Sequence, residues 1–363
     1  MPEFIKGRDL CRDFYFEIAE PILKAHFPSL KYSAGLLGYG SDILGYDDAT
    51  STDHMWGPRF YLFVENENLA LKEKIFEVFS HTLPYTYKGY SVHFSEPDPN
   101  DNGVQHAEII TEGPVNPLIF FYTPNDYLRE YLGTSELSAL SAADWLSFSE
   151  HRLLALTKAE FYKDDLHFAE KLEVLKEYPY DVWLYLAASN WSLLAEEQAF
   201  VKRCYDVGDE AGSILVCARI AERLMRLCFL YCRQYAPYSK WFGTAFSRLP
   251  ISDEIRSAIH GALTARDIKE RENSIVLAQK LVADLHDSLN VTEPIHAEIQ
   301  SYFGRDIKVI FADNIAGLLE EKLSDTPLRG LPLIGSLSEV ADFTVLSDDP
   351  NHRTRVKSLY KTE

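Results

Sequence analysis

The sequence has no uninterrupted apolar run of about 18 residues, the length that a transmembrane helix needs, so we expect no membrane span. Its first residues, MPEFIKGRDLCRDF, lack an apolar core after their charges, and we therefore expect no secretory signal. The five cysteines are odd in number and lack the spacing of a disulfide framework, which favours a reducing compartment. Together these absences predict a cytoplasmic protein.

Basic residues are scarce relative to acidic ones. There are 36 Lys and Arg against 55 Asp and Glu, which gives a net charge of −19. Such a surface repels the phosphate backbone of nucleic acids unless a local basic groove intervenes, and the sequence has no block of Lys and Arg interleaved with aromatic residues. The composition thus argues against a nucleic-acid partner and favours small-molecule substrates.

Three common catalytic signatures are also missing. The sequence contains no H-E-x-x-H, no G-x-S-x-G and no G-x-x-x-x-G-K, so a zinc protease, a serine hydrolase and a P-loop enzyme have little support. What the sequence does contain is 46% hydrophobic and 13% aromatic residues, enough for well-packed cores. A length of 363 residues suits one large or two ordinary domains.

The first third of the chain alternates between helical and extended patterns. Apolar residues recur at helical spacing in two segments and fill several shorter runs between turn residues. Pro21 is expected to kink or divide the first helix. We predict a small α/β domain with a mixed sheet over residues 1–125. Its expected helices are 8–26 and 66–82, and its expected strands are 30–38, 60–64, 90–94 and 108–111.

After residue 125 nearly every segment has an apolar period of 3.6 residues, which predicts a helical domain over 126–325. Ser141 and Ser252 are expected N-caps. The last segment, 326–363, contains several Pro and Gly residues and is expected to be loosely structured. The predicted fold class is α+β, a small mixed sheet with helices followed by a mostly α-helical domain. The expected later helices are 141–159, 165–177, 181–205, 210–235, 253–263 and 266–290.

The main functional candidate is the stretch from Leu36 to Arg59, LLGYGSDILGYDDATSTDHMWGPR. Gly40 would let the backbone turn tightly and bring N–H groups close to an anion, and Ser41 adds a hydroxyl donor. Asp53 follows near a strand, where a carboxylate could hold a divalent cation against phosphate oxygens. This order of residues predicts a nucleotide-handling site.

The same residues carry a resemblance. Gly40-Ser41, eleven further residues and then Asp53 resemble the signature of the DNA-polymerase-β-like nucleotidyltransferase superfamily, in which a Gly-Ser or Gly-Gly pair precedes an Asp-x-Asp/Glu on a strand. The longer string as far as Arg59 resembles the branch called domain of unknown function 4037, as does the stretch YAPYSKWFGTAF at 235–246. The resemblance implies a nucleotidyltransferase-like fold and an enzyme that moves a nucleoside monophosphate from a nucleoside triphosphate to a small hydroxyl-bearing acceptor, with Mg²⁺ or Mn²⁺.

The resemblance also implies roles for individual residues. Gly40 and Ser41 would hold the nucleotide phosphates, and Asp53 would bind the metal. We further expect Arg59 and Lys240 to balance charge on the triphosphate, since both cations accompany the matching stretches. Tyr238, two residues before Lys240, is placed to stack or hydrogen-bond with the nucleotide. Asp53, Arg59 and Lys240 are thus the expected catalytic residues.

One departure from the superfamily pattern concerns the metal. Met55 stands where the second acidic residue belongs, and a thioether is a poor ligand for Mg²⁺. Either Asp47, Asp48 or His54 supplies the missing ligand, or the catalytic metal is lost. His93 likewise stands at the expected position of a third carboxylate, with Glu96, Asp98 and Glu108 as alternatives. A second hypothesis is therefore a catalytically inactive protein of this fold that binds nucleotide or a protein partner.

Arg219, Arg223 and Arg226 form a stripe at i, i+4 and i+7 on an otherwise apolar helix. They either form salt bridges, for which Glu196, Glu197, Asp209 and Glu210 are the candidates, or form a cationic wall facing the nucleotide or an acidic acceptor. The sequence leaves open which nucleoside triphosphate and which acceptor are used. It also leaves open the oligomeric state, a homodimer included.

Overall fold

The computed structural model describes residues 3–38, 40–52, 55–324, 327–341, 346 and 349–360. It divides into two compact units. The first unit comprises Met1–Ser138 and Arg152–Lys176, and the second comprises Ala139–His151 and Glu177–Glu363. The sequence predicted domains over 1–125 and 126–325 with a C-terminal segment 326–363, and in the structure residues 152–176 belong to the first unit.

A four-stranded mixed sheet in the order β5-β2-β1-β6 forms the centre of the first unit. The strand β1 (Tyr32–Leu36) is antiparallel to β2 (Phe60–Val64) and to β6 (Glu160–Asp164), and β2 is parallel to β5 (Ile119–Tyr122). Every residue of β1 and β2 is buried, as expected for central strands with long apolar runs. The prediction of a small mixed sheet is confirmed.

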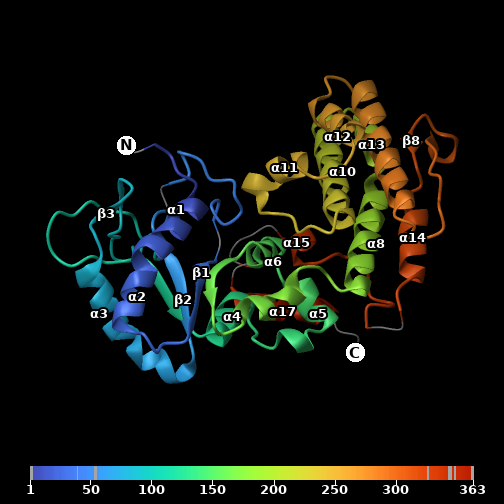
Figure 1. Ribbon diagram of the computed structural model, residues 1–363. Helices are drawn as coiled ribbons and strands as arrows, with labels where there is room; N and C mark the ends of the chain where they lie inside the picture. The colour runs from blue at the N-terminus through green and yellow to red at the C-terminus, as the bar shows by residue number, and fades with distance from the viewer. Residues whose placement is uncertain are drawn as a thin grey trace. The chain divides into compact units, whose positions relative to one another are not determined.

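The N-terminal helices and α3 (Lys72–Thr82) cover one face of this sheet, beside β1 and β2 (Figure 1). The first helix runs without interruption through α1 (Gly7–Phe14), a π-helical turn (Tyr15–Ala19) and α2 (Glu20–His26). The π-helical turn lies directly before Pro21, so the hydrogen-bond register changes where the proline removes an N–H. Helix α3 follows a 3₁₀ turn over Asn66–Leu71 and ends before Pro84, as predicted.

The two short predicted strands are the least accurate part of the prediction for this unit. The 90–94 segment contributes only β4 (Tyr90–Ser91), which pairs with β3 (Thr86–Tyr87), and an isolated bridge at Phe94. The predicted strand at 108–111 is wrong, because these residues adopt no regular structure. The third and fourth strands of the main sheet are instead β5 and β6, which the sequence analysis did not predict.

Aromatic side chains fill the other face of the sheet. The Tyr61 ring stacks on Phe120 with 4.4 Å between ring centroids, and Phe63 contacts Phe168 edge to face at 4.8 Å. This layer is closed by α4 (Pro124–Leu132), whose N-cap Thr123 accepts a hydrogen bond from the Asp126 N–H, and by α7 (Phe168–Leu172). A 3₁₀ turn (Glu173–Leu175) follows α7.

The second unit is built almost entirely of helices, as predicted, and its longest helices pack side by side (Figure 1). Two predicted helices are each split in two, at 141–159 and at 181–205. Helix α6 begins in the second unit and ends in the first. The main helices are α5 (Ala142–Ser147), α6 (Glu150–Thr157), α8 (Tyr180–Glu197), α9 (Phe200–Asp206), α10 (Glu210–Tyr231), α11 (Ser239–Ser247), α12 (Asp253–Thr264), α13 (Ile268–Ser288) and α14 (Asp313–Glu321).

Both predicted N-caps are confirmed. Ser141 forms a capping box with Asp144 at the start of α5, and the Ser252 side chain accepts a hydrogen bond from the Ile255 N–H at the start of α12. The C-terminal residues, expected to be loosely structured, include the short helices α15 (Leu337–Val340) and α17 (Pro350–Val356) and a 3₁₀ turn at Lys357–Tyr360. A small hairpin of β7 (Gln300–Ser301) and β8 (Lys308–Val309) precedes α14. Among the described helices, none combines the length and the apolar character that crossing a membrane requires.

Candidate functional site

The loop that follows β1 turns sharply at its glycines. Gly38 has φ +93° and Gly40 has φ +142°, values that side chains other than glycine rarely adopt. The Gly40 carbonyl accepts a hydrogen bond from the Leu44 N–H at 3.3 Å. The Ser41 carbonyl accepts the N–H groups of Tyr46 and Asp47 at 2.7 and 3.1 Å. The chain therefore makes a closed turn directly after the Gly-Ser pair.

The backbone N–H groups at the start of this turn are the chemically useful feature. Within the part of the chain that the structure describes, the N–H groups of Gly40, Ser41 and Asp42 donate to no other group. Gly40 and Ser41 are half-buried, so solvent or a ligand can reach them. Successive N–H groups in a turn form a concavity that binds anions. The geometry thus suits a phosphate.

A buried ion pair joins the turn to Arg59 at the end of the loop. The Arg59 guanidinium lies 2.6 Å from the Asp42 carboxylate, and both side chains are almost fully buried. Burial lowers the pKa of Arg59, but the Asp42 carboxylate, together with Cys11 and Tyr61, more than offsets it, and this pKa lies above its usual value. Asp42 already neutralises the guanidinium, so a triphosphate would have to compete with Asp42 for Arg59.

Asp47, a candidate metal ligand, has partners on both carboxylate oxygens. One oxygen accepts the N–H of Gly7 at 2.7 Å and the indole N–H of Trp56 at 3.2 Å, and the other lies 3.4 Å from the Lys6 ammonium. The side chain is fully buried at the start of α1, where a helix N-terminus favours a negative charge. In this arrangement Asp47 ties the loop to α1 through one oxygen, and its other oxygen accepts no hydrogen bond and has the Lys6 ammonium as its charged neighbour.

Asp48, the other candidate, is exposed and closes a turn. One oxygen accepts the Thr50 N–H at 2.9 Å and the hydroxyls of Thr50 and Ser51 at 2.6 and 3.1 Å. These hydrogen bonds, those from Thr50 first, lower the pKa of Asp48. Asp53 and His54 lie outside the described residues. Among the residues that are described, no group of three or more His, Cys, Asp and Glu is placed to hold a metal ion.

The strand that runs parallel to β2 differs from the one expected to carry a third carboxylate. It is β5, and on the face where Tyr61 lies it presents Phe120 and Tyr122, which stack with the Tyr61 ring. His93, at the expected third position, accepts the Asn116 N–H on its Nδ1 at 2.9 Å. This face of the sheet is therefore aromatic, and the position where a third carboxylate was expected holds the hydrogen-bonded ring of His93.

Two residues that the sequence analysis did not single out are linked to the loop. The Tyr131 hydroxyl donates to the Gly38 carbonyl, and Arg152 contacts Tyr131. Tyr127 and Tyr131 stand four residues apart on one face of α4, a spacing that was readable in the sequence. Nothing in the sequence around these tyrosines indicates that they lie close to Gly38, which is more than 80 residues earlier in the chain.

Tyr238 and Lys240, the predicted nucleotide contacts from the later part of the chain, lie in the second unit. The Tyr238 hydroxyl accepts the indole N–H of Trp241 at 2.9 Å, and its ring meets the edge of His151. Lys240 is exposed at the start of α11, with its ammonium 5.1 Å from the Trp241 ring centroid. The other described candidates, Gly40, Ser41, Asp47, Asp48 and Arg59, are all in the first unit.

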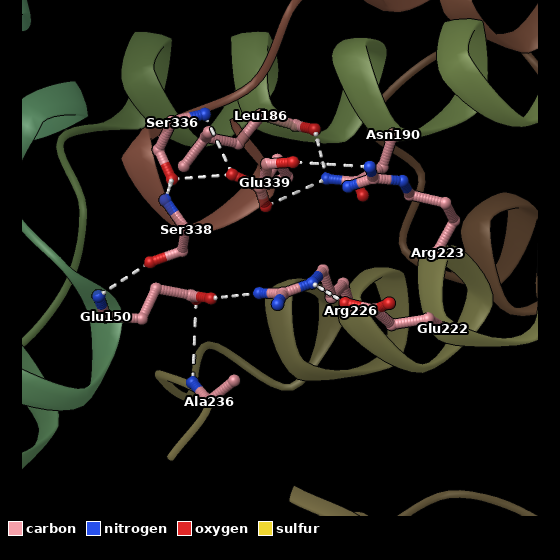
Figure 2. A network of polar contacts seen from close by, with 10 residues as sticks. All are labelled: Glu150, Leu186, Asn190, Glu222, Arg223, Arg226, Ala236, Ser336, Ser338 and Glu339. Carbon is pink, nitrogen blue, oxygen red and sulfur yellow. Dashed lines mark hydrogen bonds and ion pairs between the residues drawn. The ribbon is translucent and has the colours of Figure 1, made fainter. Parts of the chain in front are cut away.

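The arginine stripe on α10 is held by partners within the second unit, and Figure 2 shows those of Arg223 and Arg226. Arg219 donates three hydrogen bonds to Glu197, two of them at 2.9 and 3.0 Å, which confirms the salt-bridge interpretation for this residue. Arg223 donates to the Glu339 carbonyl at 3.3 Å. Arg226 lies 3.0 Å from Glu150 and 3.0 Å from Glu222, partners that were not among the predicted ones.

Glu150 is the most deeply buried acid of this network. One of its carboxylate oxygens meets Arg226, and the other accepts the Ala236 N–H at 3.5 Å (Figure 2). Burial and the neighbouring Glu339 raise the pKa of Glu150, and Arg226 opposes this rise without cancelling it. Its backbone N–H donates to the Ser338 hydroxyl at 3.0 Å, which joins the start of α6 to α15.

Glu150 and the arginine stripe of this network lie within a segment that is similar to a known family. Residues 145–242 match the model of the family described as "Domain of unknown function (DUF4037)". The match supports the part of the resemblance that named domain of unknown function 4037, and it includes Glu150, the arginine stripe, Tyr238 and Lys240 but not the stretch 36–59. A search of curated proteins found no match to the chain.

Proposed function

We propose that this protein is a metal-dependent nucleotidyltransferase that moves a nucleoside monophosphate from a nucleoside triphosphate to a small hydroxyl-bearing acceptor. The observation that carries the proposal is the accessible turn at Gly40–Asp42, whose three successive N–H groups have no acceptor within the described residues. Backbone N–H groups suit phosphate oxygens because they donate without a bulky side chain in the way. The resemblance of the surrounding sequence supplies the reaction class.

The reaction needs little from the protein beyond orientation and charge. The acceptor oxygen forms a bond to the α-phosphorus, the bond to the β-phosphate oxygen breaks, pyrophosphate leaves and the acceptor proton passes to solvent. A bound Mg²⁺ or Mn²⁺ would neutralise developing negative charge on the phosphates. Because Asp47 is committed to α1 and Asp48 to its turn, Asp53 is the carboxylate that we propose for the metal. The turn itself would orient the phosphates.

A second candidate function is nucleotide binding without transfer. The observation that favours it is His93, which stands where a third carboxylate was expected and whose Nδ1 already accepts the Asn116 N–H at 2.9 Å. The commitment of Arg59 to Asp42 points the same way, since it occupies a cation that the transfer reaction would use.

Thermal unfolding of the full chain with each of the four common nucleoside triphosphates, in Mg²⁺, Mn²⁺ or a chelator, tests both functions. A ligand at about 100 times its dissociation constant stabilises a protein by roughly 2.7 kcal/mol, a readily measured shift. Stabilisation that needs the metal, with pyrophosphate released when an acceptor is added, supports the transferase. Stabilisation without metal or pyrophosphate supports the second candidate, and no stabilisation by any nucleotide contradicts both.

The role of Asp53 is tested by a matched pair of substitutions. Asp53→Asn should abolish pyrophosphate release while leaving the unfolding midpoint close to that of the wild type. Asp48→Asn makes the same chemical change in the same loop, at a residue whose hydrogen bonds are local, and should retain activity. Full activity of Asp53→Asn would remove this residue from the mechanism.

A further inference from the structure

A chain of three contacts connects α6 to the turn that we propose for phosphate binding. The Arg152 guanidinium donates to the Tyr131 carbonyl at 2.7 Å and lies over the Tyr131 ring, 4.6 Å from its centroid. The Tyr131 hydroxyl in turn donates to the Gly38 carbonyl at 3.3 Å. All three residues belong to the first unit and are buried.

The position of the Tyr131 hydroxyl is fixed by packing. Its ring stacks on that of Tyr127, with 5.4 Å between centroids and 17° between planes. Tyr127 meets the Tyr61 ring edge to face at 5.6 Å. A tyrosine has only two side-chain torsions, so a ring held on one face by another aromatic ring and on a second side by a guanidinium leaves its hydroxyl little freedom.

Gly38 is where this rigid group meets the turn. A Cβ at Gly38 would lie 2.5 Å from the Tyr61 hydroxyl oxygen, so the backbone here packs directly against tyrosine. The carbonyl that Tyr131 holds is two residues before Gly40, whose φ of +142° begins the turn. Because each peptide unit is planar, holding the Gly38 carbonyl fixes the orientation of the peptide unit through which the chain enters the turn.

We propose that Tyr131, held by Arg152, is a positioning residue for the turn at Gly40–Asp42 and thereby sets the affinity for nucleotide phosphates. This inference rests on the proposed function. Tyr131 acts through the Gly38 carbonyl and does not touch the phosphates. Losing one hydrogen bond of this kind should weaken nucleotide binding about 3- to 10-fold.

The test compares two tyrosines of the same aromatic layer. Tyr131→Phe keeps the ring and removes the hydroxyl that holds Gly38, whereas Tyr122→Phe removes a hydroxyl that donates to Glu130 at 3.1 Å. The full chain is titrated with ATP and Mg²⁺, and hydrogen exchange is measured for amides 40–44. We expect weaker ATP binding and faster exchange in Tyr131→Phe and wild-type values in Tyr122→Phe. In turnover, KM should rise and kcat should stay unchanged.

Wild-type binding and exchange in Tyr131→Phe would overturn the inference, as would equal effects in both variants. Arg152→Gln should reproduce the Tyr131→Phe effect, and the double variant should not add to it, because both residues act through one contact. If the wild-type protein binds none of the four nucleoside triphosphates, the proposed function is contradicted. A rise in exchange confined to Tyr131→Phe would then still support its control of the turn, and an unchanged rate would overturn that as well.

Discussion

Asp42 and Arg59 illustrate how a single buried charge depends on its partner. Each side chain loses almost all contact with water, and each is compensated mainly by the other at 2.6 Å. Such a pair is weak evidence for stability as a whole, because desolvation offsets much of the attraction. Removing one member has a far larger effect, since the remaining charge stays buried without compensation. The pair therefore makes the loop sensitive to substitution.

We predict that Asp42→Asn lowers the free energy of unfolding by about 3 to 5 kcal/mol, because it leaves the Arg59 guanidinium buried beside a neutral group. Asp48→Asn, an exposed change in the same loop, should alter it by no more than about 0.5 kcal/mol. Urea unfolding of both variants gives the comparison. A loss below about 1 kcal/mol in Asp42→Asn would show that Arg59 finds other compensation.

At Glu150 the buried network has an excess of negative charge, whereas the Asp42–Arg59 pair is balanced. With Glu150 ionised, the carboxylates of Glu150, Glu222 and Glu339 all act on the single guanidinium of Arg226. A neutral Glu150 reduces this excess of negative charge, which agrees with the rise of its pKa to about 8 caused first by burial. The buried Tyr178 hydroxyl also lies in the field of Glu150, and burial raises the pKa of Tyr178 well above its usual value.

This raised pKa predicts a pH dependence. The folded state holds the Glu150 proton more tightly than the unfolded state, whose pKa is near 4.5. The stabilising contribution is therefore complete below 4.5 and is lost as the pH rises to about 8, with a slope of up to about 1.4 kcal/mol per pH unit. Glu150→Gln should remove this slope, and Glu222→Gln should retain it. Parallel curves for wild type and Glu150→Gln from pH 5 to 8 would contradict the prediction.

At the scale of secondary-structure elements, a line of buried hydrogen bonds joins three helices of the second unit. The indole N–H of Trp191 on α8 donates to the Tyr231 hydroxyl on α10 at 2.6 Å, and that hydroxyl lies 3.0 Å from Nδ1 of His286 on α13. His286 Nε2 lies 2.8 Å from the Thr292 hydroxyl, which donates to the Glu293 carbonyl. An indole can only donate, so the Tyr231 hydroxyl is free to donate to a neutral imidazole.

Burial lowers the pKa of His286, in agreement with a neutral ring. Since the unfolded state then binds the proton more readily, this contribution to stability is present above pH 6.5 and is lost as the pH falls toward the folded-state pKa. We predict that the stability difference between wild type and His286→Gln shrinks from pH 7 to pH 5. His296, which is exposed, provides the control substitution to Gln. A difference that stays constant with pH would show that His286 keeps its unfolded-state pKa.

The elements that the sequence predicted are those with local signals. The strand within 60–64 is a continuous apolar run and the segment 30–38 is largely apolar, and the N-caps at Ser141 and Ser252 are set by the residues that follow them. Strand β6 was missed because its residues, EFYKD, are half polar, and its partner β1 lies more than 120 residues earlier in the chain. Pairing over that distance leaves no local pattern.

The same distinction applies to the candidate site. The turn at Gly40-Ser41 was readable because glycine and short polar residues specify turns locally. The ion pair between Arg59 and Asp42 could not be predicted in this way. In the sequence, an Asp that closes a turn looks the same as an Asp that pairs with a buried guanidinium. The partner of Arg226 was likewise hidden, because Glu150 lies 76 residues away in the chain.

At the scale of the whole molecule, the division into two units predicts which segments a bound nucleotide protects from hydrogen exchange. The proposed turn lies in the first unit, so ATP with Mg²⁺ should slow hydrogen exchange in β1, β2 and the loop between them. Helices α12 and α13 of the second unit provide an internal reference, and their exchange should change less. Protection confined to the second unit would place the nucleotide site elsewhere.

The way the chain passes between the units has a consequence for its synthesis. A ribosome completes residues 1–138 and then makes 139–151 of the other unit before it returns to 152–176. Strand β1 thus lacks its neighbour β6 until residue 164 has emerged, and until then its free edge can pair wrongly. Neither unit corresponds to one uninterrupted stretch of the gene. A gene truncated at residue 138 would therefore encode a sheet in which β1 lacks its neighbour β6. Each unit thus requires a gene that encodes both.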